Sequence, residues 1–450
     1  MNELPYSPEE QPAKSWLSTS ITVKMIIIAA LALLMLIPAN LVQPIISERE
    51  NTGRSVETEV EKAWAGNQQI AGPVLTVPYV KISPKGEKQY HNKHFLPQQL
   101  DVTGKLSPEK LERSIYEITV YDAALNVNGN FDVAAIQSAL FDGTPLWENA
   151  YLSIAINDLS GVQNALNFKL DNEQLPIKSG LKSKILGESG VTLPIDLTTH
   201  FFTNWQFNFD LQVKGTSEIA FLPIGNSTSV NLSSPWNAPG FNGAFSPDNK
   251  SIQNDGFTAQ WDILELNRNY PQMWDDDAYT SQLQESAFGV DLVNTTNDYQ
   301  KAMRSVKYAI LTIGLTFLVF FLVEIINGNR IHPFQYILVG LALSLFYVLL
   351  ISISEHIDFN IAYLIAAAVI VTMITLYSLA VFSQKKLSVL LFFILSGLYG
   401  FLFVILQAND YALLLGSIGL VIMLALTMYL TRYFRSFLIS KSRLNELIPY

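Results

Sequence analysis

A chain of 450 residues, of which 49% are hydrophobic, is too long for one ordinary domain, and this average combines two unlike halves. The absence of cysteine excludes disulfides, thiol catalysis and cysteine-based zinc or iron–sulfur sites. Residues 43–307 carry 20 Lys and Arg against 31 Asp and Glu, a balance of −11, which argues against nucleic acid as a partner.

The amino-terminal part predicts a tail followed by a membrane anchor. Residues 1–22 are rich in Pro, Ser and Thr and lack apolar periodicity, so we expect a cytoplasmic tail without a fold. Residues 23–46 contain a long uncharged apolar run with no convincing small-residue cleavage site. We therefore predict an uncleaved transmembrane signal anchor there.

The next segment, residues 47–306, predicts a β-rich domain that starts with a helical stalk. Val56, Val60 and Trp64 recur every four residues among charged residues, which is typical of an amphipathic helix. After Gly72-Pro73, β-branched and aromatic runs alternate with turn residues, as expected of strands. An extracytoplasmic domain without disulfides must be stabilised by its core alone.

The clearest strand is residues 207–213, whose alternation places four apolar side chains on one sheet face. Residues 132–140 predict a short helix between strands. The many short strands favour an antiparallel, sandwich-like fold. The other predicted strands are 118–127, 151–156, 165–170 and 218–222.

Residues 233–249 predict a long aromatic loop, because Trp236, Phe241 and Phe245 are interspersed with Pro and Gly. These three residues are a candidate binding loop of the domain. The alternative is a cover over a sheet edge, since aromatic side chains serve packing first.

Residues 307–431 predict a bundle of five transmembrane helices. The apolar runs are each long enough to cross about 30 Å of hydrocarbon at about 1.5 Å per residue. Together with the anchor, these five runs make six spans. The five runs cover residues 308–326, 334–353, 361–382, 388–406 and 411–430.

Basic residues predict the orientation of this bundle. The loops 327–330 and 383–386 and the tail 432–450 carry Lys or Arg, whereas the loops 354–360 and 407–410 carry neither. Because cytoplasmic loops retain basic residues, we expect both termini in the cytoplasm and the β-rich domain in the periplasm.

Five ionisable residues at or near membrane depth are candidate functional or structural groups. Glu324 lies about one turn before a helix end, where Arg330 or His332 could pair with it across the tight loop. Glu355 and His356 end the following helix on the other side. The alternative to a polar pathway is interfacial anchoring and helix capping. Small residues such as Gly340 and Ser344, four positions apart, predict close helix packing.

Catalytic signatures are missing from the chain: there is no Gly-x-Ser-x-Gly elbow, Walker loop, His-Glu-x-x-His or dinucleotide fingerprint. His91 and His94 lack a third metal ligand in view, and Asp275-Asp276-Asp277 is more typical of a solvated turn. We therefore predict no enzymatic activity, cofactor or metal.

Residues 298–356 carry specific motifs that resemble the CreD family of bacterial inner-membrane proteins. The resemblance extends more loosely to Gly72-Pro73 and to residues 256–261, so it covers most of the chain. The motifs are Lys307-Tyr308-Ala309-Ile310-Leu311, Phe320-Phe321, Glu324, Arg330-Ile331-His332-Pro333, Gln335-Tyr336 and Ser354-Glu355-His356.

This resemblance implies an inner-membrane protein that supports cell envelope integrity and the envelope stress response. We expect the periplasmic domain to contact envelope components or partner proteins while the bundle resides in the lipid bilayer. The alternative is a transporter or channel that uses polar groups in the bundle. The sequence leaves the oligomeric state open.

Overall fold

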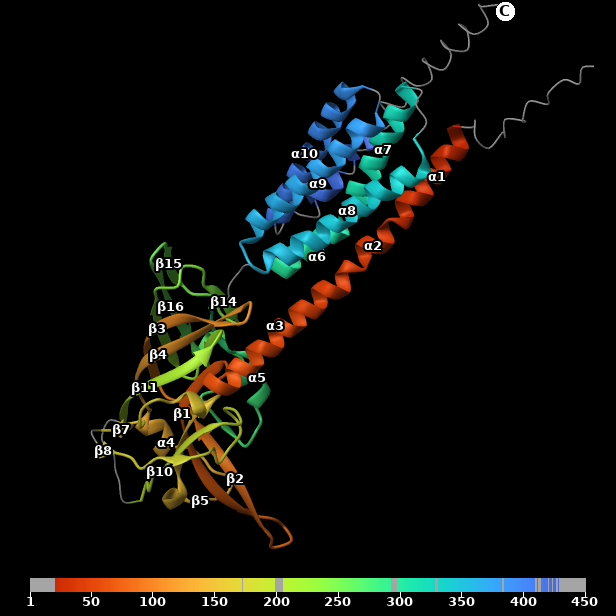
Figure 1. Ribbon diagram of the computed structural model, residues 1–450. Coiled ribbons are helices and arrows are strands. Elements are labelled where there is room, and N and C mark those ends of the chain that lie inside the picture. The colour runs from red at the N-terminus through yellow and green to blue at the C-terminus, as the bar shows by residue number, and fades with distance from the viewer. Residues whose placement is uncertain are drawn as a thin grey trace, which may run out of the picture. The chain divides into compact units, whose positions relative to one another are not determined.

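Figure 1 shows the computed structural model, which describes residues 21–171, 173–198, 205–292, 298–327, 331–382, 384–408, 411, 414–419, 421–422, 424–425 and 428. The chain divides into two compact units. A helical unit combines Met1–Asn51 with Asn297–Tyr450, and a β domain comprises Thr52–Thr296. The β domain is shorter than the expected 47–306. The helix Val42–Trp64 crosses the expected start at residue 47, and the helix Asp298–Lys307 begins before the expected end at residue 306.

The helical unit consists of long apolar helices, as its sequence predicts. By length and composition, Val23–Trp64, α8, α9 and α10 could each cross a membrane, and α6 and α7, bent by 42°, qualify together. The expected span 411–430 is described only in pieces, of which helical residues 414–419 are the longest. The helices are α1 (Ile21–Leu34), α2 (Leu36–Asn40), α3 (Val42–Trp64), α6 (Asp298–Lys307), α7 (Ala309–Asn327), α8 (Pro333–Ser354), α9 (Phe359–Val381) and α10 (Lys385–Gln407).

Close packing joins the first helices to α8. Met35, between α1 and α2, lies against Gly340, where an added Cβ would collide with the Met35 side chain and with the Phe317 ring. The Ser344 hydroxyl, four residues further along, donates to the Met35 carbonyl at 3.4 Å. The small residues at 340 and 344 therefore form the close helix contact that their spacing predicts.

Sheet A of the β domain runs in the order β14-β18-β12-β1-β6-β10-β9, with β2 and β5 also pairing with β1 and β17 pairing with β2. Its interior strand β6, which lies between β1 and β10, is buried along its whole length. The strands are β1 (Gln68–Ile82), β2 (Lys88–Phe95), β5 (Thr144–Pro145), β6 (Tyr151–Ile156), β9 (Lys178–Ser179), β10 (Gly190–Pro194), β12 (Glu218–Phe221), β14 (Gly240–Gly243), β17 (Met273–Asp275) and β18 (Phe288–Asp291).

Sheet B runs in the order β15-β16-β13-β3-β4-β11-β7-β8. Its strand β11 alternates buried and exposed residues, as predicted for 207–213. The strands are β3 (Gln99–Arg113), β4 (Tyr116–Asn130), β7 (Lys169–Leu170), β8 (Glu173–Gln174), β11 (Gln206–Thr216), β13 (Ser227–Ser234), β15 (Asn249–Gln253) and β16 (Gly256–Leu264).

One hydrophobic core draws side chains from both sheets, including Leu152 of β6, Leu125 of β4 and Phe209 of β11. The sheets thus share a core as in a β-sandwich. Two parallel pairs, β1 with β12 and β3 with β13, make the sheets mixed rather than wholly antiparallel. The short helices between strands are α4 (Val133–Gln137), η2 (Trp147–Asn149), η3 (Leu159–Gly161), η4 (Glu265–Asn267) and α5 (Thr280–Glu285).

The predicted amphipathic stalk is the end of α3, and its apolar face is covered within the β domain. Val60 is buried with Ile118 and Val120 of β4, and Val56 and Trp64 pack beside them. The ammonium of Lys214 lies 3.7 Å from the centre of the Trp64 ring. These contacts fix the last turns of α3 on sheet B.

Candidate functional site

The carboxylate of Glu324 is the most deeply buried charge of the helical unit among the described residues, with 5% of its side chain exposed. Lys24 of α1 forms an ion pair with Oε1. The Ile331 N–H donates to Oε1 at 3.0 Å, and the Tyr336 hydroxyl of α8 donates to Oε2 at 3.1 Å. A buried carboxylate requires such partners, because its desolvation is costly.

The partners differ from those expected from the sequence. Arg330 lies outside the described residues. His332 is exposed and caps α8: its Nδ1 accepts from the Phe334 N–H at 3.2 Å, and its own N–H donates to Gln335 at 3.0 Å. Pro333 begins that helix, as its missing amide hydrogen favours. His332 therefore does not join Glu324 in the described structure.

Lys24 escaped the sequence analysis because it is 300 residues away from Glu324. In the sequence, Lys24 is recognisable only as a single charge directly before an apolar run. Tyr336 likewise lies within an apolar run. The sequence around Glu324 suggested partners nearby in the chain, whereas α1 supplies the cation, Lys24.

A second ion pair involves the other end of α8. Glu355 follows α8, and its Oε1 lies 3.4 Å from Nε of Arg49 in α3. Glu355 is 13% exposed and Arg49 is 50% exposed, so solvent weakens this pair. His356 is exposed beside it. Both Glu324 and Glu355 are therefore bound to helices that precede the β domain in sequence.

Other polar groups inside the bundle are engaged locally. The Thr312 and Tyr347 hydroxyls are 2.9 Å apart, and Thr312 also donates to the Ala309 carbonyl at 2.9 Å. The Tyr363 hydroxyl donates to the Tyr399 carbonyl at 2.8 Å. These bonds satisfy polar groups within the helix contacts themselves.

The aromatic segment 233–249 is only partly a loop, because Gly240–Gly243 forms strand β14 and pairs with β18 at the edge of sheet A. Phe241 packs edge-on against Trp261, and Phe245 packs edge-on against Phe288. Trp236 is half-buried against the same core. The rings are thus used for packing at a sheet edge, and a binding role for them stays a prediction.

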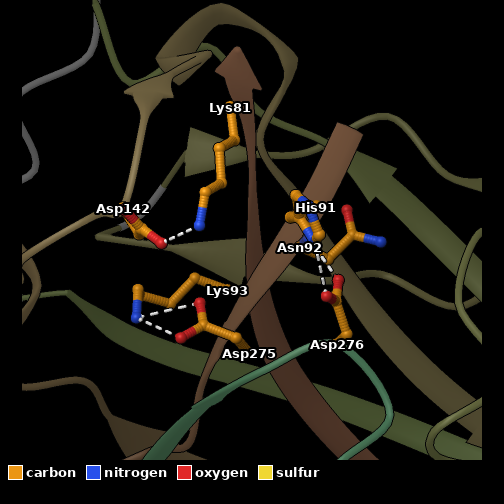
Figure 2. Close-up of polar contacts among 7 residues, drawn as sticks. All are labelled: Lys81, His91, Asn92, Lys93, Asp142, Asp275 and Asp276. Carbon is orange, nitrogen blue, oxygen red and sulfur yellow. Dashed lines mark hydrogen bonds and ion pairs between the residues drawn. The ribbon is translucent and has the colours of Figure 1, made fainter. Parts of the chain in front are cut away.

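Figure 2 shows a polar cluster on β2 that joins segments far apart in sequence. Asp276 Oδ2 lies 2.6 Å from Nδ1 of His91, and Asp276 Oδ1 accepts from the Asn92 N–H at 2.9 Å. Lys93 pairs with Asp275 at 2.9 Å, and Lys81 pairs with Asp142. The pairing of β17 with β2 brings Asp275 and Asp276 to Lys93 and His91, which are far from them in sequence. Lys81 belongs to β1, and Asp142 lies just before β5.

The surroundings of this cluster shift the pKa values of Asp276 and Tyr79 in opposite directions. Burial would raise the pKa of Asp276, but the hydrogen bonds from the His91 ring and from the Asn92 N–H outweigh it, so this pKa is lowered. Burial, followed by the charge of Asp275, raises the pKa of Tyr79 to about 12. The Tyr79 ring stacks on His91 with 5.3 Å between ring centres.

His94 faces the interior on the other side of β2. It is fully buried, its Nδ1 lies 2.9 Å from the Thr76 hydroxyl, and its ring lies beside Trp274. Burial lowers the pKa of His94 to about 4, although Asp276 and Asp275 oppose this shift. Across the described residues, no group of three or more His, Asp or Glu side chains is placed to hold a metal ion.

Comparisons with known proteins give one consistent relationship. A family model described as "Inner membrane protein CreD" matches residues 20–435. Inner membrane protein CreD of Escherichia coli (strain K12) is 31% identical over 416 residues, which cover 91% of this chain and 92% of that protein. The M1 zinc metallopeptidase from Deinococcus radiodurans is 9% identical over 44% of this chain and 42% of that chain, with a TM-score of 0.20, which carries no argument.

We predict that Lys24→Met destabilises the detergent-purified protein more than Glu324→Gln does. Lys24→Met leaves a buried carboxylate without its cation, at a cost of about 3 kcal/mol. In Glu324→Gln the Lys24 side chain, which is 33% exposed, can turn its ammonium toward water. Melting temperatures of the variants measure the difference, with Lys385→Met on the exposed start of α10 as the control.

Equal and negligible melting-temperature losses in both variants would show that the ion pair does not support the helical unit. A Glu324→Gln protein of unchanged stability that has lost its function in cells would instead favour a proton or ion pathway through this site. The double variant should regain part of the Lys24→Met loss, because the two residues share one interaction.

We also predict that the β domain loses stability in mild acid through His94. Its folded pKa of about 4 lies below the unfolded value of 6.5, so the unfolded chain binds more protons between these values. The stabilisation is complete above pH 6.5 and is lost as pH falls toward 4, by on the order of 3 kcal/mol. His94→Asn should flatten the pH dependence of unfolding in this window, whereas the exposed control His356→Asn should keep it.

Proposed function

Because the chain belongs to the CreD family of inner-membrane proteins, we propose that it supports cell envelope integrity and the envelope stress response from the inner membrane. It acts as a non-enzymatic protein. The β domain contacts envelope components or partner proteins, and the helices span the bilayer and anchor the β domain to it.

The observation that carries this proposal is the size and position of the β domain. Thr52–Thr296 is a compact unit with its own core, inserted between the first apolar helix and the remaining ones. Anchoring in a membrane does not require a folded β domain of this size. A binding domain on a multi-pass anchor accounts for both units.

The proposed topology has six spans, with both termini in the cytoplasm and the β domain in the periplasm. Its support is the alternation of basic and non-basic short loops along 307–431. An acidic domain without cysteine or disulfides suits the periplasm when its core is extensive, as it is here.

A non-enzymatic role is supported by how the polar residues are used. His91 and Asp276 are 2.6 Å apart, as in a catalytic dyad, yet no described group hydrogen-bonds to His91 Nε2. A hydrolase would need a nucleophile at that atom. The surrounding ion pairs instead attach β17 to β2.

A transporter is the second candidate, favoured by the buried charge of Glu324 and the interior hydroxyls of Thr312 and Tyr347. Buried ionisable groups in membranes often mark ion pathways. Here the carboxylate is held by three donors, and Thr312 bonds to its own helix. This arrangement fits a structural ion pair that holds the helices together better than it fits an ion-transport site.

The proposal predicts that cells lacking this protein become more sensitive to detergent and to other envelope stress. The full chain should restore resistance, and a chain with a flexible linker in place of residues 66–292 should not. Immunoblots of the membrane fraction must show equal amounts of both proteins. Full restoration by the chain without its β domain would contradict the proposal.

A further inference from the structure

Arg268 is a charged residue in the interior of the β domain. It lies between β16 and β17, directly after the short helix η4, and only 8% of the residue is exposed. Its guanidinium lies over the Tyr270 ring, 4.6 Å from the ring centre. Arginine is almost never buried to this extent without a partner, because a charge removed from water loses its hydration. A partner for this cation is therefore expected.

Two of the three guanidinium nitrogens have no acceptor among the described residues. Nε and Nη1 of Arg268 are both buried and unpartnered. Nη2 donates to the side-chain oxygen of Gln272 at 2.7 Å when the Gln272 amide turns this oxygen toward Arg268. In that orientation the same oxygen accepts from the Asn226 N–H at 2.6 Å. The hydrogen-bond acceptor of the guanidinium is thus a neutral amide.

The acidic residue of η4 does not pair with Arg268. The Glu265 carboxylate accepts instead from Asn226 Nδ2, at 2.6 Å. Burial lowers the pKa of Arg268, although Tyr270 and Glu265 oppose this shift. A guanidinium stays protonated in proteins, so Arg268 is a cation without an ion-pair partner. The basic residues of the β domain that do form ion pairs, in the part of the chain that the structure describes, are Lys81, His91, Lys93, Lys110 and Lys184.

The interior beside Arg268 contains further polar atoms without a partner. Trp274 Nε1 and His94 Nε2 are buried and unpartnered. The rings lie in series: the centres of Tyr270 and Trp274 are 6.3 Å apart, and those of Trp274 and His94 are 5.8 Å apart. Buried N–H groups normally have an acceptor. The described residues of this region thus supply fewer acceptors than donors, which favours a ligand that accepts hydrogen bonds.

The charge of Arg268 selects an anion among such ligands. A neutral acceptor leaves the cation unpaired, whereas an oxyanion forms charge-assisted hydrogen bonds that are about twice as strong as neutral ones. Nη2 belongs to both forked edges of the guanidinium, one shared with Nε and the other with Nη1. Each edge can therefore hold two oxygens of a carboxylate or a phosphate group.

We propose that Arg268 binds an oxyanion, a carboxylate or a phosphate group, which replaces the Gln272 amide oxygen between Arg268 and Asn226. Gln272 is only half-buried, so its side chain can turn toward solvent. The anion then accepts from Nη2 and from one nitrogen that now lacks a partner. Such a site supplies one class of ligand for the proposed envelope role, and its existence does not depend on that role.

A small anion is expected to bind weakly. The Glu265 carboxylate is close enough to act on the charge of Arg268, so it also repels an incoming anion. The Asn226 N–H is shared, because it donates to the Pro97 carbonyl at 3.0 Å as well. The Tyr270 ring acts in the other direction, since it holds the guanidinium plane in place before the anion arrives. Small-anion probes are therefore required at millimolar concentrations.

Melting of the full-length protein in detergent, followed by tryptophan fluorescence, tests this site. All tryptophans except Trp16 belong to Thr52–Thr296, so the signal reports on the β domain. The probes are sodium acetate and sodium phosphate, each compared with sodium chloride at the same ionic strength. We expect the melting temperature to rise by about 4 °C when a bound probe is about tenfold above its dissociation constant.

Arg268→Met removes the charge and keeps an unbranched stem over Tyr270, so the anion-dependent rise should disappear. The matched control is Arg113→Met, because Arg113 is exposed on β3, and it should keep the full rise. Gln272→Ala removes the competing amide. It should lower the anion concentration of half-maximal effect about fivefold, as expected for one net hydrogen bond. This variant tests the site even when Arg268→Met does not fold.

A response to acetate alone assigns the site to carboxylates, a response to phosphate alone assigns it to phosphate groups, and a response to both supports the shared oxyanion chemistry. Equal melting temperatures in acetate, phosphate and chloride would overturn the inference. A rise that Arg268→Met retains would also overturn it, as would a half-maximal concentration that Gln272→Ala leaves unchanged. None of these results on the purified protein bears on the envelope role, which the resistance of cells tests separately.

Discussion

The helical unit depends on the neutralisation of one buried carboxylate. Glu324 is 5% exposed in an apolar bundle, so the unit requires Lys24, Tyr336 and the Ile331 amide around it. Because Lys24 belongs to α1 and Tyr336 to α8, and Ile331 lies just before α8, satisfying one charge brings separate helices together. The contact of Met35 with Gly340 then continues this association along the first helix.

The β domain follows a different constraint, the alternation of strand side chains between core and surface. Strand β11 shows it directly, with Phe207 and Phe209 in the shared core and Asn208 on the exposed side. The same alternation that builds the sandwich leaves the other side of the strand at the surface. Substitutions on that side therefore leave the shared core intact.

Local patterns predicted much of the fold. The strands at 151–156 and 207–213 and the short helix after Asp132 agree with the structure, since periodicity and capping act within a few residues. The predicted strand 165–170 is strand only at Lys169–Leu170, because β7 pairs with just two residues of β11 at the end of the sheet. Lys24 with Glu324, and His91 with Asp276, escaped prediction because only the tertiary fold makes them neighbours.

Oxidative crosslinking tests most directly the central claim that the first helix is docked on the bundle around the Glu324 ion pair. The chain has no native cysteine, so a pair of introduced cysteines reports one contact. Met35→Cys with Gly340→Cys should form a disulfide in membranes. Ile37→Cys, at a position 57% exposed, should not do so with Gly340→Cys when Met35→Ala is also present to make room for the new Cβ. Equal crosslinking of both pairs, or of neither, would contradict the account.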